Sequence, residues 1–394
     1  MAASSKPARI RLGMVGGGEG AFIGAVHRIA ARLDDQYELL AGALSSTPEK
    51  ARRSGLALGL DPARTYDTFE AMATAEAARE DGIEAVAIVT PNHLHAPVAT
   101  AFLKAGIHVI CDKPVTTTSA DAKALAALAK KQGLVFAVTH NYSAYPMVRM
   151  ARQMVQQGRL GDIRVVQAEY PQDWLAEPLE LTGQKQAAWR TDPAQAGGGA
   201  IGDIGSHAWH LADYVTGQPL AELCAELSSF VPGRPIDDNA QMLLRYANGA
   251  RGAIWASQVA PGHLNDLRLR VYGSKGGLEW RQESPNQLRY TPLGQPTQLL
   301  ERAGAGFGEA GSRINRIPGG HPEGYLEAFA SLYSEVAQHL LAARPGSRKA
   351  AKADKACHFP TIADGLRGVQ FIEAVQRSSR LGGRWVKLPV APKA

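Results

Sequence analysis

Apolar runs alternate with helical patterns over the first 140 residues of the chain. Five of these runs, rich in Val, Ile, Leu and Ala, predict buried strands at residues 10–15, 37–44, 85–90, 107–111 and 134–138. The segments between them have helical periodicity. One such segment begins at Ser119, which can cap a helix, and stops before Gly133. Strand, helix and strand in this repeat predict an α/β doubly wound parallel sheet with right-handed crossovers.

After about residue 140 the pattern changes to longer runs in which apolar and polar residues alternate. These runs predict strands at 164–170, 240–246, 250–257 and 267–272. Helical patterns are expected at 146–157, 206–216, 323–343 and 361–378. The second half is therefore predicted to be an α+β domain with a large, mostly antiparallel sheet.

The change of pattern predicts two domains. Residues 1–140 form a dinucleotide-binding domain, and residues 141–394 form a domain for substrate binding and oligomerisation. The last helix can pack back on the first domain. The glycine-rich segment 302–320 is expected to be a long mobile loop, and whether it is a lid or merely disordered stays open.

Composition excludes several classes of protein. With 45% hydrophobic and 20% charged residues the chain is an ordinary globular protein, and it has no apolar run long enough to cross a membrane. The first residues lack a signal-peptide core, so we expect a cytoplasmic protein. Three distant cysteines without CxxC spacing favour neither disulfides nor a metal site. The net charge of +6 is scattered, and the densest basic run, 344–355, lacks aromatic residues, so no nucleic-acid partner is expected.

A glycine-rich turn follows the first predicted strand and opens a helix. Glycines allow the main chain to approach a pyrophosphate, and a helix N-terminus attracts anions. The turn therefore predicts a Rossmann-type dinucleotide site, although five residues separate Gly18 from Gly24 where the usual spacing has two. The candidate cofactor contacts in this turn are Gly16, Gly18, Glu19, Gly20, Ala21, Phe22 and Ile23.

The end of the second predicted strand usually decides between the two nicotinamide cofactors. An acidic residue there binds the ribose 2′-hydroxyl of NAD, and an arginine favours the 2′-phosphate of NADP. This chain has Ser45 and Ser46 instead, and the following helix carries Lys50, which can reach a phosphate. NAD is the favoured cofactor, with NADP left open.

Polar clusters also follow the third and fourth predicted strands. Thr90, Pro91 and Asn92 come first, with His95 shortly after them, and Asp112 and Lys113 follow the fourth strand. Carboxyl ends of parallel strands share one edge of the sheet, where ligands bind. We expect these side chains to contact the nicotinamide half of the cofactor, although His95 can equally cap the following helix.

Several ordered motifs carry a resemblance to a known family. They are the glycine turn, the segments 90–95 and 112–114, Gly197–His207, Asp237–Ala240 and Tyr272–Gly277. Together they resemble the Gfo/Idh/MocA oxidoreductases, in which the sequence Glu-Lys-Pro usually stands where this chain has Asp112-Lys113-Pro114. The resemblance implies hydride transfer between NAD(P) and a hydroxyl carbon of a sugar, polyol or glycoside, by a homodimer or homotetramer.

The resemblance also implies that Lys113, Asp203 and His207 form the catalytic group. Asp203 and His207 are four residues apart, so a helix starting near Asp203 would place them on one face. We expect His207 to be the general base, Asp203 to orient it, and Lys113 to stabilise negative charge on the reacting oxygen. No metal ion is expected to take part.

Six further residues are candidates for substrate contact. His140, Asn141 and Tyr142 end the fifth predicted strand at the domain junction, although a buried structural histidine is an alternative reading of His140. The weaker candidates, Trp189, Arg190 and His321, lie in strings typical of a subgroup of the family. Among these, Arg190 would suit an anionic substrate.

Two other functions stay open at the level of sequence. One is a glycoside hydrolase that oxidises the sugar transiently with NAD, and the other is a non-catalytic dinucleotide-binding protein.

The second predicted sheet has large apolar side chains on both faces. Ile254 and Trp255 are neighbours on one strand and point to opposite faces of this sheet. Large apolar groups on both faces indicate that a partner covers one of them.

Overall fold

The computed structural model describes residues 9–344 and 358–389. Cys357, the first eight residues and all of the basic run 344–355 except Arg344 lie outside the described residues. In the part of the chain that is described, no helix is both long and apolar enough to cross a membrane.

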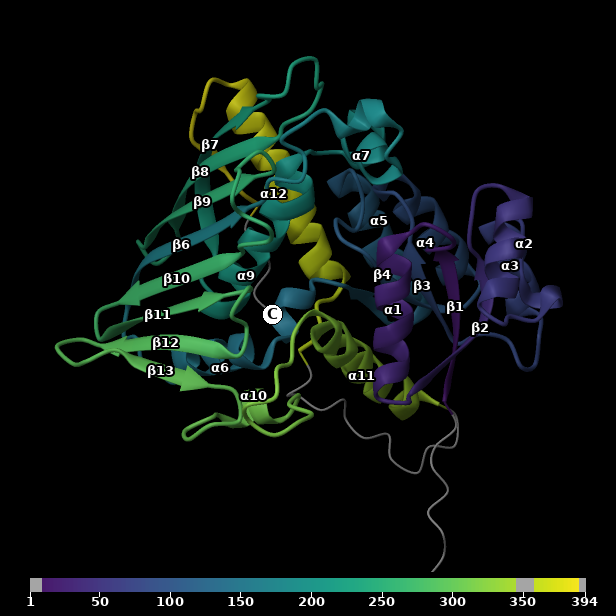
Figure 1. Cartoon of the computed structure of the whole chain (residues 1–394), viewed down its shortest axis with the longest axis horizontal. Helices are drawn as coiled ribbons and strands as arrows, with labels where there is room; N and C mark the ends of the chain where they lie inside the picture. Colours follow the sequence, from purple (N-terminus) through teal and green to yellow (C-terminus); the bar gives the residue numbers. More distant parts are fainter. Residues whose placement is uncertain (1–8, 345–357, 390–394) are drawn as a thin grey trace, which may run out of the picture.

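The first half forms the parallel sheet that its alternating pattern predicts. Its strand order is β2-β1-β3-β4-β5, with every neighbouring pair parallel (Figure 1). The order turns at β1, which places the glycine turn at the point where ligands bind such sheets. The strands are β1 Ile10–Gly16, β2 Tyr37–Ala43, β3 Ala85–Val89, β4 His108–Cys111 and β5 Phe136–Val138.

Helices cover both faces of this sheet because its strands are apolar on both sides. One face packs on α1 and on the late helix α11, and the other packs on α3, α4, α5 and the last helix α12. The helices of the first half are α1 Phe22–Leu33, α2 Pro48–Ala57, α3 Phe69–Ala77, α4 His95–Lys104 and α5 Ser119–Gln132.

The second half forms a nine-stranded sheet in the order β13-β12-β11-β10-β6-β9-β8-β7-β14. All neighbouring pairs are antiparallel except β6 and β9, which are parallel. The predicted fold class is therefore confirmed, although five of these strands, β7 and β11 to β14, were not predicted. The strands are β6 Ile163–Pro171, β7 Leu220–Ser228, β8 Asn239–Tyr246, β9 Arg251–Ser257, β10 Arg268–Gly273, β11 Gly276–Arg281, β12 Gln287–Pro292, β13 Gln298–Glu301 and β14 Val386–Lys387.

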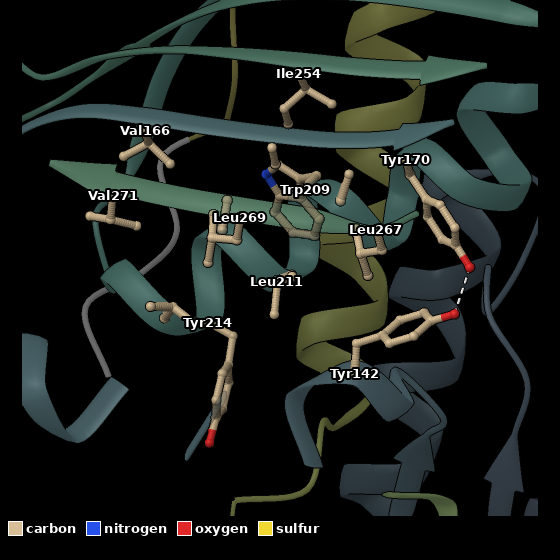
Figure 2. Close-up of a cluster of buried hydrophobic side chains, with 14 of the residues drawn as sticks. Tyr142, Val166, Tyr170, Trp209, Leu211, Tyr214, Ile254, Leu267, Leu269 and Val271 are labelled. Atoms are coloured by element: carbon tan, nitrogen blue, oxygen red, sulfur yellow. Dashed lines mark hydrogen bonds between the residues drawn. The ribbon is translucent and has the colours of Figure 1, made fainter. Parts of the chain in front are cut away.

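One face of the large sheet carries the core of the second half. Ile254 and Leu269 lie on this face above Trp209 and Leu211 of α9 (Figure 2). Helix α6 and the later part of α12 complete the core. The helices of this half are α6 Pro146–Gln156, α7 Lys185–Arg190, α8 Pro193–Ala196, α9 Ser206–Thr216, α10 Glu309–Ser312, α11 Tyr325–Ala343 and α12 Ile362–Arg380.

The two long C-terminal helices join the halves of the chain. Helix α11 lies against α1, and α12 runs from α5 at the parallel sheet to β7 of the large sheet (Figure 1). Val369 belongs to the core of the first half, while Phe371 and Val375 belong to the core of the second. The same helix therefore contributes to the cores of both halves.

The outer face of the large sheet mixes apolar and charged side chains. Trp255 points away from the core that holds Ile254, and its indole N–H donates to Asn239 Oδ1 at 2.9 Å. Leu243 and Tyr272 are exposed on the same side as Trp255. Arginine–glutamate pairs on β6, β10 and β11 lie between these apolar groups.

The glycine-rich segment 302–320 is neither a structureless loop nor a lid on the cavity. The side chain of Arg302 is buried and donates to Asn286 Oδ1 at 2.7 Å and to the Ile317 carbonyl at 2.8 Å. It also pairs with Glu323, and the short helix α10 interrupts the segment. None of these residues lines the cavity, so the described segment does not cover it, and the mobility expected of this loop stays a prediction.

Candidate active site

A cavity of about 1320 Å³ lies where the carboxyl ends of the parallel strands face the second half of the chain. Its lining begins at the glycine turn and reaches Lys113 at the end of β4. Tyr170 of β6 and His207 of α9 complete the wall opposite the parallel sheet. One continuous space therefore joins the predicted dinucleotide site to the predicted catalytic residues.

The main chain shapes the end of the cavity at the glycine turn. Gly16 and Gly17 have φ angles of +79° and +72°, which other residues rarely adopt. A Cβ atom on Gly24 would lie 2.4 Å from the Cα of Gly17, so the strand and helix approach each other only because both residues are glycine. Helix α1 starts at Phe22 without an acidic residue in its first turn, which leaves its N-terminus favourable for an anion.

Polar side chains flank the same end where β2 stops. Ser45, Ser46 and Lys50 line the cavity. Glu19 lies opposite them and is paired with Arg53, the closest N–O distance being 2.7 Å. A 2′-hydroxyl would meet serine hydroxyls here, and a 2′-phosphate would meet Lys50.

Lys113 and Asp203 form an ion pair across the two halves of the chain. Lys113 follows β4, and its Nζ donates to both the carbonyl and the Oδ1 of Asp203, the latter at 3.2 Å. Asp203 lies in a π-helical turn, Ile201–Gly205, just before α9. Its Oδ2 accepts from Gln258 Nε2 at 2.9 Å and lies 3.4 Å from Arg190 Nε. Burial raises the pKa of the Asp203 carboxyl, but Lys113 and Arg190 outweigh burial and lower it overall.

His207 points into the cavity from the first turn of α9. Behind it, His140 packs edge-on against His207 with a centroid distance of 5.9 Å, and His140 stacks on His210 at 4.0 Å. Burial, the nearby Lys113 and the other two imidazoles lower the pKa of His207 well below its ordinary value. The imidazole is therefore neutral at physiological pH and has an unprotonated nitrogen that can accept a hydrogen bond.

A chain of uncharged hydrogen bonds forms the wall next to His207. The hydroxyls of Tyr142 and Tyr170 are 2.5 Å apart, and Tyr170 also donates to Asn265 Oδ1 at 2.7 Å (Figure 2). Gln172 Nε2 donates to the same oxygen at 2.6 Å. Gln172 in turn accepts from the indole of Trp174 at 3.1 Å. This wall offers amides, hydroxyls and an aromatic surface without a net charge.

Helix α7 brings two more side chains to the cavity. The Arg190 guanidinium lies 4.2 Å from the ring centroid of Trp189 and 6.0 Å from that of Trp174. Its Nη1 donates to Gln186 Oε1 at 2.5 Å. Because Arg190 also pairs with Asp203, much of its charge is already balanced within the protein.

Comparison with known proteins identifies the family. Residues 10–140 match the oxidoreductase family with an NAD-binding Rossmann fold, and residues 148–279 match the GFO/IDH/MocA C-terminal domain. The chain belongs to this family. It is therefore an NAD-binding oxidoreductase, as the ordered motifs predicted.

Three relatives show how closely the whole chain follows the family. The crystal structure of an oxidoreductase from Sinorhizobium meliloti is 56% identical, with a TM-score of 0.87, and the match covers 96% of this chain and 100% of that one. An inositol dehydrogenase homolog from Azotobacter vinelandii, complexed with NADH and myo-inositol, is 36% identical with a TM-score of 0.91, covering 97% and 98%. The levoglucosan dehydrogenase of Pseudarthrobacter phenanthrenivorans is 30% identical over 71% of this chain and 75% of its own length.

In this family member the cavity gathers most of the residues predicted from the sequence. Asn141, Tyr142, Trp189 and Arg190 line it together with the three predicted catalytic residues. The predicted cofactor contacts that line it are Gly16, Gly18, Glu19, Ala21, Phe22, Ile23, Ser45, Ser46, Lys50, Thr90, Pro91, Asn92, Asp112 and Lys113.

Two predicted cofactor contacts do not reach the cavity. His95 is fully buried, with Nδ1 2.8 Å from the Pro114 carbonyl and Nε2 3.0 Å from the Thr90 carbonyl. It joins the loops after β3 and β4 instead of contacting a ligand. Gly20 is absent from the lining because the turn directs it outward, where a Cβ atom would meet nothing within 4 Å.

Two predicted substrate contacts also lie outside the cavity lining. His140 does not line the cavity, because the turn after β5 directs its ring into the core between His207 and His210. The side chain of His321 is exposed and does not line the cavity, and the main-chain carbonyl of His321 accepts a hydrogen bond from Arg302.

The structure corrects the expected partnership of Asp203 with His207. Both residues line the cavity, but the Asp203 carboxylate is directed to Lys113, Arg190 and Gln258. The Nδ1 of His207 is buried without a hydrogen-bond partner among the described residues. The reason is electrostatic, since two cations attract the carboxylate more strongly than a neutral ring does.

The sequence did not single out several residues of this site. Tyr170, Gln172 and Asn265 come from strands or loops whose alternation identified a sheet but not which ends face the cavity. Tyr325 reaches the cavity from the first position of α11. Its place in the string Gly320–Tyr325, which is typical of a subgroup, was the one available signal.

Proposed function

We propose that this protein is an NAD-dependent dehydrogenase that oxidises a hydroxyl-bearing carbon of a sugar or polyol. One observation carries the proposal. A neutral imidazole, His207, and a cationic donor, Lys113, share one continuous cavity with the glycine turn. Oxidation of an alcohol needs both groups beside a hydride acceptor.

The residues present fit a nicotinamide dinucleotide. The glycine turn lines the cavity, and a Cβ atom on Gly18 would lie 2.5 Å from the Leu44 carbonyl, so only glycine fits at this position. Thr90 Oγ1 and Asn141 Nδ2 are buried without hydrogen-bond partners in the described chain, and both residues line the cavity. When bound, the nicotinamide ring supplies the acceptor for the hydride.

The protein's own groups handle the proton and the charge. Lys113 lies at the cavity wall, where its ammonium can donate to the oxygen of the reacting hydroxyl and stabilise alkoxide character. Asp203 fixes this ammonium through two acceptors, so we assign it as the residue that positions Lys113. His207 is neutral and buried, and it accepts the hydroxyl proton.

The wall of the cavity supports a neutral polyhydroxylated substrate. The amides of Gln172, Gln282 and Asn265 can both donate to and accept from hydroxyl groups. The indoles of Trp174 and Trp189 offer flat surfaces to the C–H groups of a ring. Relatives named for levoglucosan and crystallised with myo-inositol act on or bind such molecules, which agrees with this lining.

A substrate panel tests the proposal. Purified protein is incubated with NAD or NADP and with sugars, polyols and glycosides, while absorbance of the reduced nicotinamide is recorded and products are analysed by mass spectrometry. We expect one reduced cofactor for each substrate molecule that loses two hydrogens. Glycoside cleavage without net cofactor reduction would contradict the proposal and point to a hydrolase that uses NAD only transiently.

We further propose that copies of the chain associate through the outer face of the large sheet. Exposed Leu243 and Tyr272 beside half-buried Trp255 support a contact there. Light scattering should give the mass of a dimer or tetramer, and Leu243→Glu should lower it. A monomeric wild-type protein would contradict this assignment.

A further inference from the structure

Asp112 places a carboxylate in the cavity that the proposed chemistry does not use. It follows β4 directly before Lys113, lines the cavity, and keeps 16% of its side-chain surface accessible. Its Oδ1 accepts from Thr139 Oγ1 at 2.5 Å and lies 3.1 Å from His27 Nε2. Among the described residues these bonds involve only Oδ1 and leave Oδ2 without a hydrogen-bond donor.

The partners of Asp112 allow it to keep its full negative charge. His27 is fully buried on α1, and its Nδ1 lies 2.8 Å from the hydroxyl of Tyr333. Both ring nitrogens of His27 are therefore occupied, Nδ1 by the Tyr333 hydroxyl and Nε2 by Asp112. Burial raises the pKa of Asp112, but charge attraction to His27 and the hydrogen bonds from His27 and Thr139 to Oδ1 outweigh burial and lower the pKa overall. The carboxyl group is therefore ionised at neutral pH.

Without the Asp112 carboxylate, the buried side chains at this end of the cavity would carry a net positive charge, which would disfavour a cationic ligand. Three other charged groups there are mostly shielded from solvent in the described chain, namely Lys113, Arg190 and Asp203. Their formal charges of +1, +1 and −1 add up to +1. His207 adds no charge because its pKa is lowered. Asp112 brings the sum to zero, so without it a cationic ring would meet a positive environment.

We propose that Asp112, held by His27 and Thr139, is the counter-ion of the oxidised nicotinamide ring and makes the protein favour NAD+ over NADH. The ring is cationic when oxidised and neutral when reduced, whereas the rest of the cofactor is identical in both forms. A fixed carboxylate therefore stabilises only the oxidised form by Coulomb attraction. This inference rests on the NAD binding of the proposed function but not on the identity of its substrate.

Binding of the two cofactor forms without substrate tests the assignment. NADH is titrated by its fluorescence, and NAD+ is titrated by calorimetry, on the full chain at neutral pH. We expect the wild type to bind NAD+ at least as tightly as NADH. In Asp112→Asn the Kd of NAD+ should rise roughly tenfold or more, while that of NADH changes less than about threefold. Asp112→Glu, which keeps the charge, should preserve most of the wild-type ratio.

A second carboxylate in the same cavity provides the matched control. Asp67 also lines the cavity, but it lies just before α3, at the end of the cavity near Ser45 and Ser46, and pairs with Arg52 at 3.0 Å. Asp67→Asn should shift both affinities equally, because both cofactor forms share their adenosine half. An unchanged ratio in Asp112→Asn, or an equal shift of the ratio in Asp67→Asn, would overturn the assignment.

The test does not depend on one variant folding or on substrate turnover. If Asp112→Asn fails to fold, Asp112→Ser replaces it as the neutral variant. Independently of any variant, the assignment is overturned if the wild-type protein binds NADH more than tenfold tighter than NAD+. Failure of the proposed sugar oxidation would leave these affinities unaffected, so the two outcomes can be told apart.

Discussion

The two ends of the cavity are built from different parts of the polypeptide. At the glycine turn the main chain forms the surface, through positive φ angles at Gly16 and Gly17 and the close approach of Gly24. At the catalytic end buried side chains form it, and Lys113 and Asp203 meet there from opposite halves of the chain. The first end therefore depends on the absence of side chains, and the second depends on charge.

This difference predicts which kind of substitution damages each end. An added methyl group should harm the glycine turn more than the loss of a nearby surface charge. Loss of a single charge should harm the catalytic end, because each charged group there serves as a partner of another.

The largest expected effect is at Lys113. Lys113→Met keeps much of the side-chain volume but removes the donor to the reacting oxygen and the partner of Asp203. We expect kcat to fall by roughly two or more orders of magnitude, with the Kd of NADH, whose nicotinamide ring is neutral, nearly unchanged. Stopped-flow absorbance and calorimetry measure the two quantities. Lys130→Met, on the exposed side of α5, is the control. Normal turnover in Lys113→Met would remove Lys113 from the mechanism.

The next largest effect is expected at the glycine end. Gly24→Ala places a Cβ atom 2.4 Å from the Cα and carbonyl oxygen of Gly17, so α1 must move away from the turn. Overpacking of this kind costs about 1–3 kcal/mol, so the Kd of NAD+ should rise roughly ten- to a hundredfold. Gly20→Ala is the matched control, since its Cβ would meet nothing and only its φ of +78° opposes the change. Equal effects of the two variants would contradict a tight approach at Gly24.

The buried histidines behind His207 should make the free energy of unfolding depend on pH in the acid range. Burial and nearby arginines lower the pKa of His210 from 6.5 to about 3. Below pH 6.5 His210 therefore binds a proton in the unfolded chain but not in the folded chain. The free energy of unfolding falls as the pH falls, by about 1.4 kcal/mol per pH unit for this residue, until about pH 3.

Replacing His210 isolates its share of this dependence. His210→Phe keeps a ring stacked on His140 and should reduce the slope of unfolding free energy against pH by about 1.4 kcal/mol per unit between pH 5.5 and 4. Urea unfolding followed by circular dichroism measures the slope. His321→Phe alters an exposed side chain and is the control. An unchanged slope in His210→Phe would mean that this imidazole titrates alike in both states.

Sequence patterns predicted the first half of the fold better than the second. Buried parallel strands are apolar on both faces, so runs such as Ala85–Val89 are easily recognised. Leu220–Ser228, with its Ala, Glu and Leu residues, has the composition of a helix but is the strand β7 between β8 and β14. Pairing with β8, the next strand, and with β14, near the other end of the chain, decides its conformation.

The same distinction applies to the site. Residues at the ends of predicted strands, such as Lys113 and Asn92, were found because the sheet fixes where strand ends lie. Whether a side chain then turns into the cavity or into the core depends on packing, which misplaced His95 and His140. The partner of Asp203 was misjudged for a related reason. Spacing suggested His207, whereas Lys113 and Arg190 approach from distant parts of the chain.

The smallest expected effect concerns cofactor choice at the end of β2. Ser45 and Ser46 provide neither the carboxylate that favours NAD nor the arginine that favours NADP, so Lys50 is the cation placed to meet a 2′-phosphate. A partly solvated charge pair contributes at most about 1 kcal/mol, so Lys50→Ala should raise the Kd of NADP+ by up to roughly fivefold. The Kd of NAD+ should stay the same, because NAD+ lacks that phosphate. Lys185→Ala, a lysine of α7 at the other end of the same cavity, should leave both affinities unchanged. An equal loss of both affinities in Lys50→Ala would instead place this ammonium at the pyrophosphate and leave the two serines alone to set the preference.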